Sequence, residues 1–181
     1  MSHLEVRSRR QPVVGWRYWQ LAVDPTIELR SLSQRGFTWR PDVSMVARCA
    51  DAGGRTGRGE HRHRAPAPGC GCGLHASVDL ASLHAQALCL RPVPLVVGEV
   101  ALWGDVITEE RVDRRGDDHR GQYGYPVSLS VIGETLEATA VGGAVDGLAR
   151  SRVPVDVTSV EVAVGELSRT ILANLSMSKP T

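Results

Sequence analysis

Apolar and polar side chains alternate along several short stretches of the chain, a pattern that predicts β-strands. The longest of them, Leu95–Ile107, carries apolar side chains on both faces, which indicates a strand that is buried on both sides or curved into a barrel. Gly98 and Gly104 are the positions where this strand could bend or bulge. The complete set of expected strands is Val13–Val23, Ile27–Leu32, Met45–Cys49, Leu95–Ile107 and Val127–Val131.

Two polar stretches between these strands are expected to be loops. Gly36–Pro41 is the first, and Thr108–Gly121 is the second. The second contains two pairs of neighbouring carboxylates among several arginines, at Glu109-Glu110 and Asp117-Asp118. A solvated and self-neutralising run of charges is the expected role of these residues, in preference to acid–base catalysis.

A different spacing of apolar residues predicts helices. Ser77 is expected to cap a helix that runs to about Cys89, whose thiol is expected to be a core side chain. A possible capping box at Thr158–Glu161 precedes an apolar stripe that ends at Leu175. Between them, apolar residues recur every four positions and predict another helix, at Leu136, Ala140, Ala144 and Leu148.

Composition and charge narrow the class of protein. The net charge of +1 over 181 residues provides no strong attraction to nucleic acid or to an anionic membrane. No apolar run reaches the ~18 residues of a membrane span, and the charged start lacks a signal core, so we expect a cytoplasmic protein. All but one of the 21 basic residues are arginines, which indicates a GC-rich, actinobacterial coding sequence. The single lysine, Lys179, lies near the C-terminus, which argues against P-loop and Schiff-base enzymes.

The cysteines and histidines carry the strongest chemical signal. The segment Ala50–Gly73 is rich in Gly, Arg, His and Pro, and it cannot build a hydrophobic core by itself. It contains His63, Cys70 and Cys72, and Cys49 directly precedes it. Clustered cysteines in a reducing compartment more often bind metal than form disulfides, and zinc prefers thiolate and imidazole ligands. We therefore predict a structural Zn²⁺ held by these four residues.

Alternatives remain open at this site. His75 and then His61 could replace His63 as the imidazole ligand. Cys70 and Cys72 could also form a strained, exchange-active disulfide, or could simply be small buried side chains beside a basic loop.

Six segments of the chain occur in a fixed order: Gly15-Trp-Arg-Tyr-Trp19, Trp39-Arg-Pro41, Ala47-Arg-Cys49, His63-Arg-Ala-Pro66, Cys70-Gly-Cys-Gly-Leu-His-Ala76 and Val97-Gly-Glu-Val-Ala-Leu-Trp-Gly104. Together they resemble a family of uncharacterised actinobacterial and phage proteins. The resemblance covers about residues 14–155 and implies Cys49, His63, Cys70 and Cys72 as the shared polar residues. The family often has an aromatic residue at the position of His75, which counts against His75 as a ligand.

Taken together, these patterns predict an α+β fold, because the strands cluster and do not alternate with long helices. We expect a small, mostly antiparallel sheet or a partly open β-barrel with a zinc knuckle and C-terminal helices. The expected organisation is a flexible tail over 1–11, a zinc-stapled β-rich domain over 12–132, a helical portion of the same globule over 133–175 and a flexible tail over 176–181.

The expected function is a non-enzymatic, zinc-stabilised binding module for nucleic acid or a protein partner. Spaced arginines in the glycine-rich loop and the aromatic residues near the strands motivate the nucleic-acid version. The alternative is an enzyme, either a thiol-redox enzyme or a zinc-dependent hydrolase that uses Cys70 and Cys72. No catalytic residue can be named, because the sequence contains no recognisable general base with an orienting partner.

Overall fold

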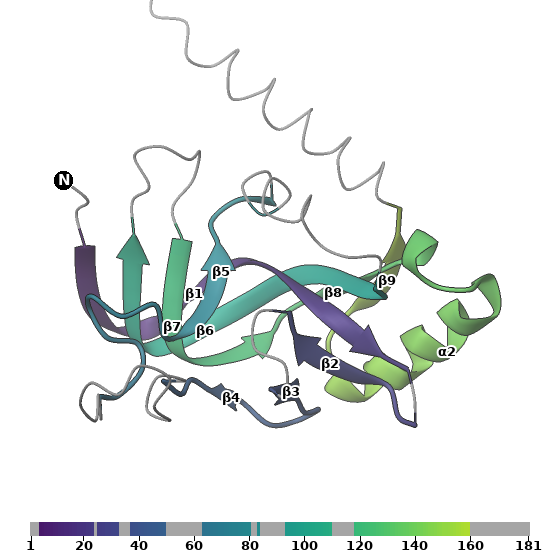
Figure 1. The fold of residues 1–181 in the computed structure, drawn as a ribbon, viewed down its shortest axis with the longest axis horizontal. Helices are drawn as coiled ribbons and strands as arrows, with labels where there is room; N and C mark the ends of the chain where they lie inside the picture. The colour runs from purple at the N-terminus through teal and green to yellow at the C-terminus, as the bar shows by residue number, and fades with distance from the viewer. Residues whose placement is uncertain are drawn as a thin grey trace, which may run out of the picture.

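A computed structural model describes residues 4–23, 25–32, 37–49, 63–80, 83, 93–109 and 118–159, with the backbone alone for 4–10. Within these ranges nine strands form one sheet, and a helix packs beside one end of it (Figure 1). The helix is α2 (Ala138–Leu148), flanked by 3-10 turns at Gly133–Thr135 and Ala149–Ser151. The strands are β1 (Leu4–Ala22), β2 (Glu28–Ser31), β3 (Thr38–Trp39), β4 (Met45–Val46), β5 (Leu74–Ser77), β6 (Leu95–Glu109), β7 (Asp118–Pro126), β8 (Leu129–Ile132) and β9 (Val155–Thr158).

The sheet is antiparallel except for one pair, because β8 and β9 run parallel. Its strand order is β3-β2-β1-β5-β7-β6-β8-β9, and β4 pairs with β7. Strand β1 also pairs with β6, so the pairings β1–β5, β5–β7, β7–β6 and β6–β1 form a closed circuit. The fold is thus β-rich α+β with a mixed sheet, as predicted in outline, although the sheet is not a clear barrel.

The two longest strands, β1 and β6, lie side by side along most of the sheet (Figure 1). The register of β6 against β7 shifts between Trp103 and Val106, which confirms the predicted bulge near Gly104. Gly104 has a φ of +79°, a backbone conformation that other residues rarely adopt. After the bulge both Val106 and Ile107 are buried, so both faces of the strand are covered there.

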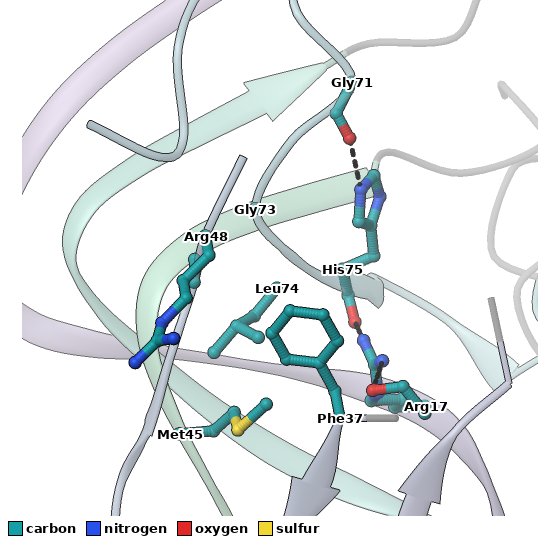
Figure 2. Close-up of a pocket in the computed structure, with 10 residues that line it drawn as sticks. Arg17, Phe37, Met45, Arg48, Gly71, Gly73, Leu74 and His75 are labelled. Carbon is teal, nitrogen blue, oxygen red and sulfur yellow. Dashed lines mark hydrogen bonds between the residues drawn. The ribbon is translucent and has the colours of Figure 1, made fainter. Parts of the chain in front are cut away.

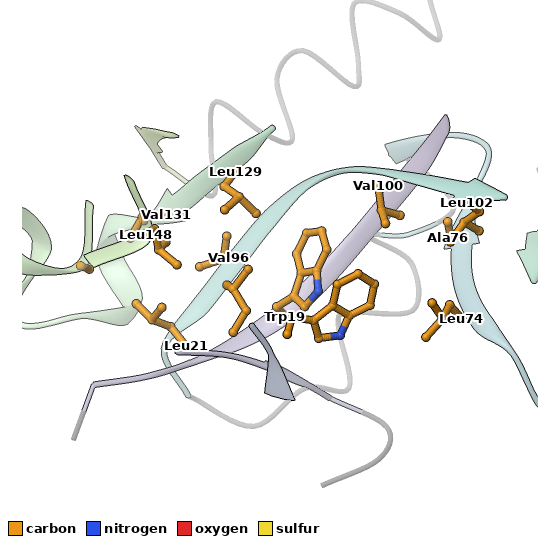
Figure 3. Close-up of a cluster of buried hydrophobic side chains, with 13 residues drawn as sticks. Trp19, Leu21, Leu74, Ala76, Val96, Val100, Leu102, Leu129, Val131 and Leu148 are labelled. Carbon is orange, nitrogen blue, oxygen red and sulfur yellow. The ribbon is translucent and has the colours of Figure 1, made fainter. Parts of the chain in front are cut away.

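Both faces of the central strands are covered. The larger buried cluster includes Trp19 of β1 (Figure 3). Its indole ring meets that of Trp39 edge to face, with ring centroids 5.6 Å apart. Leu148 of α2 joins this cluster next to Val131 of β8. Tyr18 belongs to a second, smaller cluster of buried side chains, together with Val97 and Ile132. The described residues include no helix that is long and apolar enough to span a membrane.

Several elements differ from the sequence-based expectations. Strand β1 begins at Leu4, inside the segment 1–11 that we expected to be a flexible tail, because its backbone pairs with β6 as far as Glu109. Polar side chains do not prevent this, since the ladder is formed by backbone groups. Ser77 ends strand β5 and does not cap a helix, although Leu83 donates a helical hydrogen bond to the Asp79 carbonyl.

The predicted Thr108–Gly121 loop is also wrong in part, because β6 continues to Glu109 and β7 begins at Asp118. The short strand β3 lies within the predicted Gly36–Pro41 loop, and β9 lies in the portion that was expected to be helical. Helix α2 contains Ala140, Ala144 and Leu148 of the predicted four-residue repeat, whereas Leu136 precedes the helix.

Other predictions fall outside the described residues. They are the helix from Ser77 beyond Leu83, the core position of Cys89, the C-terminal helix after Ser159 and the tail 176–181.

Candidate metal centre

Strand β7 brings the two halves of the candidate site together. Strands β4 and β5 both pair antiparallel with β7. Cys49 follows shortly after β4, and the segment between them is anchored by the Ala47 N–H, which donates to the Gln122 carbonyl at 2.8 Å. Cys72 immediately precedes the glycine before β5. Pairing with β7 therefore brings Cys49 close to Cys72, although the two residues are far apart in the sequence.

The four predicted residues form a compact cluster. The ligand atoms of Cys49, His63, Cys70 and Cys72 all lie within 4.8 Å of one another. The sulfur atoms of Cys49 and Cys70 are 3.8 Å apart, and His63 Nε2 lies 3.3 Å from the Cys72 sulfur. These four side chains are close enough to bind one metal ion.

The spacing of these atoms fits a tetrahedral zinc ion. Bond lengths of about 2.3 Å to sulfur and about 2.0–2.1 Å to nitrogen imply sulfur–sulfur separations of about 3.8 Å and sulfur–nitrogen separations of about 3.5 Å. The Cys49–Cys70 and His63–Cys72 distances of 3.8 and 3.3 Å lie close to these values. A disulfide needs a sulfur–sulfur bond of about 2.05 Å, and Cys49, Cys70 and Cys72 are free thiols.

The protonation of the thiols depends on whether a cation is bound. Burial, followed by a hydrogen bond with the Cys70 side chain, raises the pKa of the Cys72 thiol to about 11. Neighbouring thiolates would repel one another in this buried place, so the protein alone favours the neutral form. A divalent cation favours the thiolates and opposes that shift.

A buried arginine of β7 holds the loop that carries two of the cysteines. The Arg120 side chain is only 3% exposed, and its Nη1 donates to the carbonyls of Cys70 and Cys72. Its Nη2 pairs with the Glu109 carboxylate. A zinc ion with three thiolates and one imidazole carries a net negative charge, which the guanidinium would partly offset.

The structure distinguishes His63 from His75, two of the three histidines that the sequence left as alternatives. His63 lies in the cluster. The His75 ring instead donates from Nε2 to the Gly71 carbonyl at 2.9 Å, within the turn that joins Cys70 to Cys72. Burial, followed by the nearby cations Arg17 and Arg120, lowers the pKa of His75. His61 lies outside the described residues.

The structural role of Arg120 did not emerge from the sequence, which instead assigned the carboxylates of Glu109 and Asp118 to solvent. Arg120, Glu109 and Asp118 all lie in the Thr108–Gly121 stretch, which we expected to be a loop with a solvated run of charges. Arg120 is instead buried and pairs with Glu109. Asp118 is buried as well, and it accepts a hydrogen bond from the Ser77 hydroxyl at 3.0 Å. The available signal was weak, because β7 contains few aliphatic residues that would mark it as a strand.

No protein-family model, curated protein or solved structure matches this chain. The resemblance to actinobacterial and phage proteins therefore remains a prediction.

Proposed function

We propose that the chain is a non-enzymatic binding module stabilised by a structural Zn²⁺. The observation that carries the proposal is the set of four protein donor atoms within 4.8 Å of one another. Three thiols and one imidazole form a donor set typical of structural zinc sites, whereas catalytic zinc usually keeps three protein ligands and one open position. The proposed ligands are Cys49, His63, Cys70 and Cys72.

Zinc would stabilise a part of the chain that has little apolar support. Cys49 follows strand β4, and the segment from His63 to Cys72 precedes strand β5. Both parts of the chain contribute few large apolar side chains to the core. The metal would join them through direct bonds, so its binding free energy becomes local folding free energy.

Metal analysis of purified variants tests this proposal. Wild-type protein should contain about one zinc per chain, and Cys70→Ser should lose most of it, because serine oxygen is a poor ligand for zinc at a thiolate position. His75→Gln is the matched control and should retain zinc, since the His75 ring bonds to a carbonyl outside the cluster. A wild-type protein free of zinc, or unchanged zinc in Cys70→Ser, would refute the site.

We propose nucleic acid as the first partner to test, with a protein partner as the remaining possibility. Trp103 of β6 and Tyr123 of β7 stack with ring centroids 6.1 Å apart and planes 25° from parallel. Both rings are only partly buried. The exposed Arg64 donates to the side chain of Gln122, the residue before Tyr123 in β7, at 2.7 Å, and it pairs with Asp105 at 3.8 Å. Aromatic faces can stack on bases, and a guanidinium can contact phosphate.

Retention on immobilised single-stranded and duplex DNA across a salt series tests the partner. We expect retention on the single strand at low salt, weakening as salt rises. Trp103→Ala should reduce binding by about 5- to 100-fold, the range expected for one stacked base. Arg150→Gln, which removes an exposed arginine on the turn after α2, should change it little. No retention of the zinc-loaded protein at low salt would exclude nucleic acid and leave a protein partner.

A further inference from the structure

A small pocket opens beside the candidate metal centre but does not include its four side chains. Its volume is about 190 Å³. Figure 2 shows Leu74 between Arg48 on one side and Phe37 on the other. Gly71 and Gly73 of the cysteine loop form part of its wall, so the pocket and the proposed metal site share one stretch of backbone.

The charged group of greatest interest in this wall is Arg17 of β1. Its Nη1 donates to the His75 carbonyl at 2.6 Å and its Nη2 donates to the Ser31 hydroxyl at 3.2 Å, while its guanidinium carbon lies 5.2 Å from the centre of the Trp39 ring. The Arg17 Nε atom is buried and has no hydrogen-bond partner. Among the described residues, no carboxylate forms an ion pair with Arg17.

Such an arrangement leaves a cation without a counter-charge. Neutral oxygens and an aromatic face satisfy part of the Arg17 guanidinium but do not balance its charge. Burial accordingly lowers the pKa of Arg17 to about 10. An anion in the adjoining pocket would supply the missing charge and could accept further N–H bonds in the geometry that guanidinium favours.

The other residues that line the pocket indicate which chemical group should accompany the anionic group of the ligand. Arg48 adds a second, exposed guanidinium, and no acidic side chain of the described residues lines the pocket. Phe37, Met45 and Leu74 provide an apolar surface. The pocket is smaller than a typical drug-sized site, which limits the ligand to roughly one ring and one charged head.

We propose that this pocket binds a small organic anion, with a carboxylate or phosphate group directed to Arg17 and a flat apolar group against Phe37 and Leu74. No metal ion takes part in the contact, because the pocket wall contains none of the four proposed zinc ligands. The site thus goes beyond the proposed zinc-stabilised module and is tested separately from it.

The experiment is an NMR titration of the full-length, zinc-loaded protein with benzoate, phenyl phosphate and benzamide. Benzoate and phenyl phosphate compare binding of a carboxylate with binding of a phosphate. Benzamide has nearly the same shape as benzoate but carries no charge. We expect the preferred anion to bind with a dissociation constant of ~1 mM or below, as suits so small a ligand, and benzamide to bind at least ~10-fold more weakly. The side-chain resonances of Arg17 should shift on binding, since Arg17 lines the pocket.

Two variants avoid replacing Arg17, which also contributes to folding through its bonds to His75 and Ser31. Arg48→Gln should weaken anion binding by about 3- to 10-fold through loss of one charge. Ala47→Leu should block binding by filling the pocket. Arg40→Gln is the matched control, because Arg40 is exposed and does not line the pocket, and it should bind as the wild type does.

Equal binding of benzamide and benzoate, no binding of either anion up to ~10 mM, or shifts that avoid Arg17, Gly71 and Gly73 would overturn the proposal. These outcomes are distinct from failure of the zinc proposal, which is judged by metal content alone. A zinc-loaded protein that binds no anion would refute only the pocket.

Discussion

Arg120 is the residue that most clearly links the sheet to the cysteine loop. One buried guanidinium bonds to the carbonyls of Cys70 and Cys72 and pairs with Glu109 of the neighbouring strand β6. Hydrogen bonds from a charged donor are stronger than those between neutral groups. Removal of the guanidinium would leave the two carbonyls and the carboxylate without this donor at the same time. Arg120 therefore positions the metal ligands without being one.

Replacement of this arginine should be costly. Arg120→Met should lower the free energy of unfolding by about 3 kcal/mol, because two carbonyls and the Glu109 carboxylate lose their donor. The measurement is urea unfolding of the zinc-loaded proteins. Arg152→Gln is the matched control: its ion pair with Asp42 is exposed, with side chains 82% and 52% accessible, and its loss should change stability by no more than about 0.5 kcal/mol. Equal effects of the two variants would show that Arg120 does not hold the loop.

The residues that could be read from the sequence are those whose chemistry is local. Cys70 and Cys72 are separated by one residue and lie in an apolar-poor segment, and this was enough to predict a metal-binding cluster. The choice of His63 over His75 depended on how the chain turns, since the ring of His75 bonds to Gly71 instead. The role of Arg120 depended on strand pairing, which no local pattern encodes.

At the scale of elements, close approach of the backbone explains Gly98 but not Gly142. A Cβ atom on Gly98 of β6 would lie 2.0 Å from the Ser128 carbonyl oxygen, which is far inside van der Waals contact. Gly142 on α2 has no neighbouring atom within 4 Å of the same position. The first glycine is required by packing, while the second only weakens its helix.

Alanine substitutions should therefore act in opposite directions. Gly98→Ala should destabilise the protein by at least ~2 kcal/mol, because backbone must move to relieve the contact. Gly142→Ala should stabilise it by about 0.5–1 kcal/mol through helix propensity. Thermal or urea unfolding of the two variants measures both effects. Destabilisation of similar size by both alanines would contradict the packing of β6 against the turn before β8.

Strand prediction succeeded where apolar side chains alternate and failed where glycine and polar residues form the ladder. Strand β6 was found because valine and leucine recur along it. Strand β7 was missed since Gly121 and Gly124 give no apolar signal, although both are buried against Leu102. Strand β5 was missed because four residues next to a cysteine loop are too short to show a period.

At the scale of the whole molecule, the candidate metal centre lies outside the main apolar core. Figure 3 places Trp19, Val96 and Val131 in the large buried cluster. Of the four proposed ligands, none belongs to that cluster. Stability supplied by zinc should then be concentrated in the cysteine loop and in the strands that contact it.

Removal of zinc should produce an ordered loss of protection. After treatment with a strong chelator, hydrogen exchange should rise first at Cys49 and in the Cys70–Ala76 segment, and later in β6. Strand β8, which packs with α2 in the apolar cluster, should change least. Exchange mass spectrometry at several times after confirmed zinc removal follows this order. Unchanged exchange at Cys49 and Cys70–Ala76 would mean that the metal does not hold the loop.

The central claim is that three thiolates and one imidazole hold a single zinc ion. X-ray absorption at the zinc edge of the purified protein tests it most directly, because the first coordination shell reports the ligand atoms themselves. The account predicts three sulfur atoms at about 2.3 Å and one nitrogen at about 2.0–2.1 Å, with no bound water. A shell with fewer than three sulfurs, the absence of outer-shell scattering from an imidazole ring, or a protein that retains no zinc would contradict the assignment of Cys49, His63, Cys70 and Cys72 as its ligands.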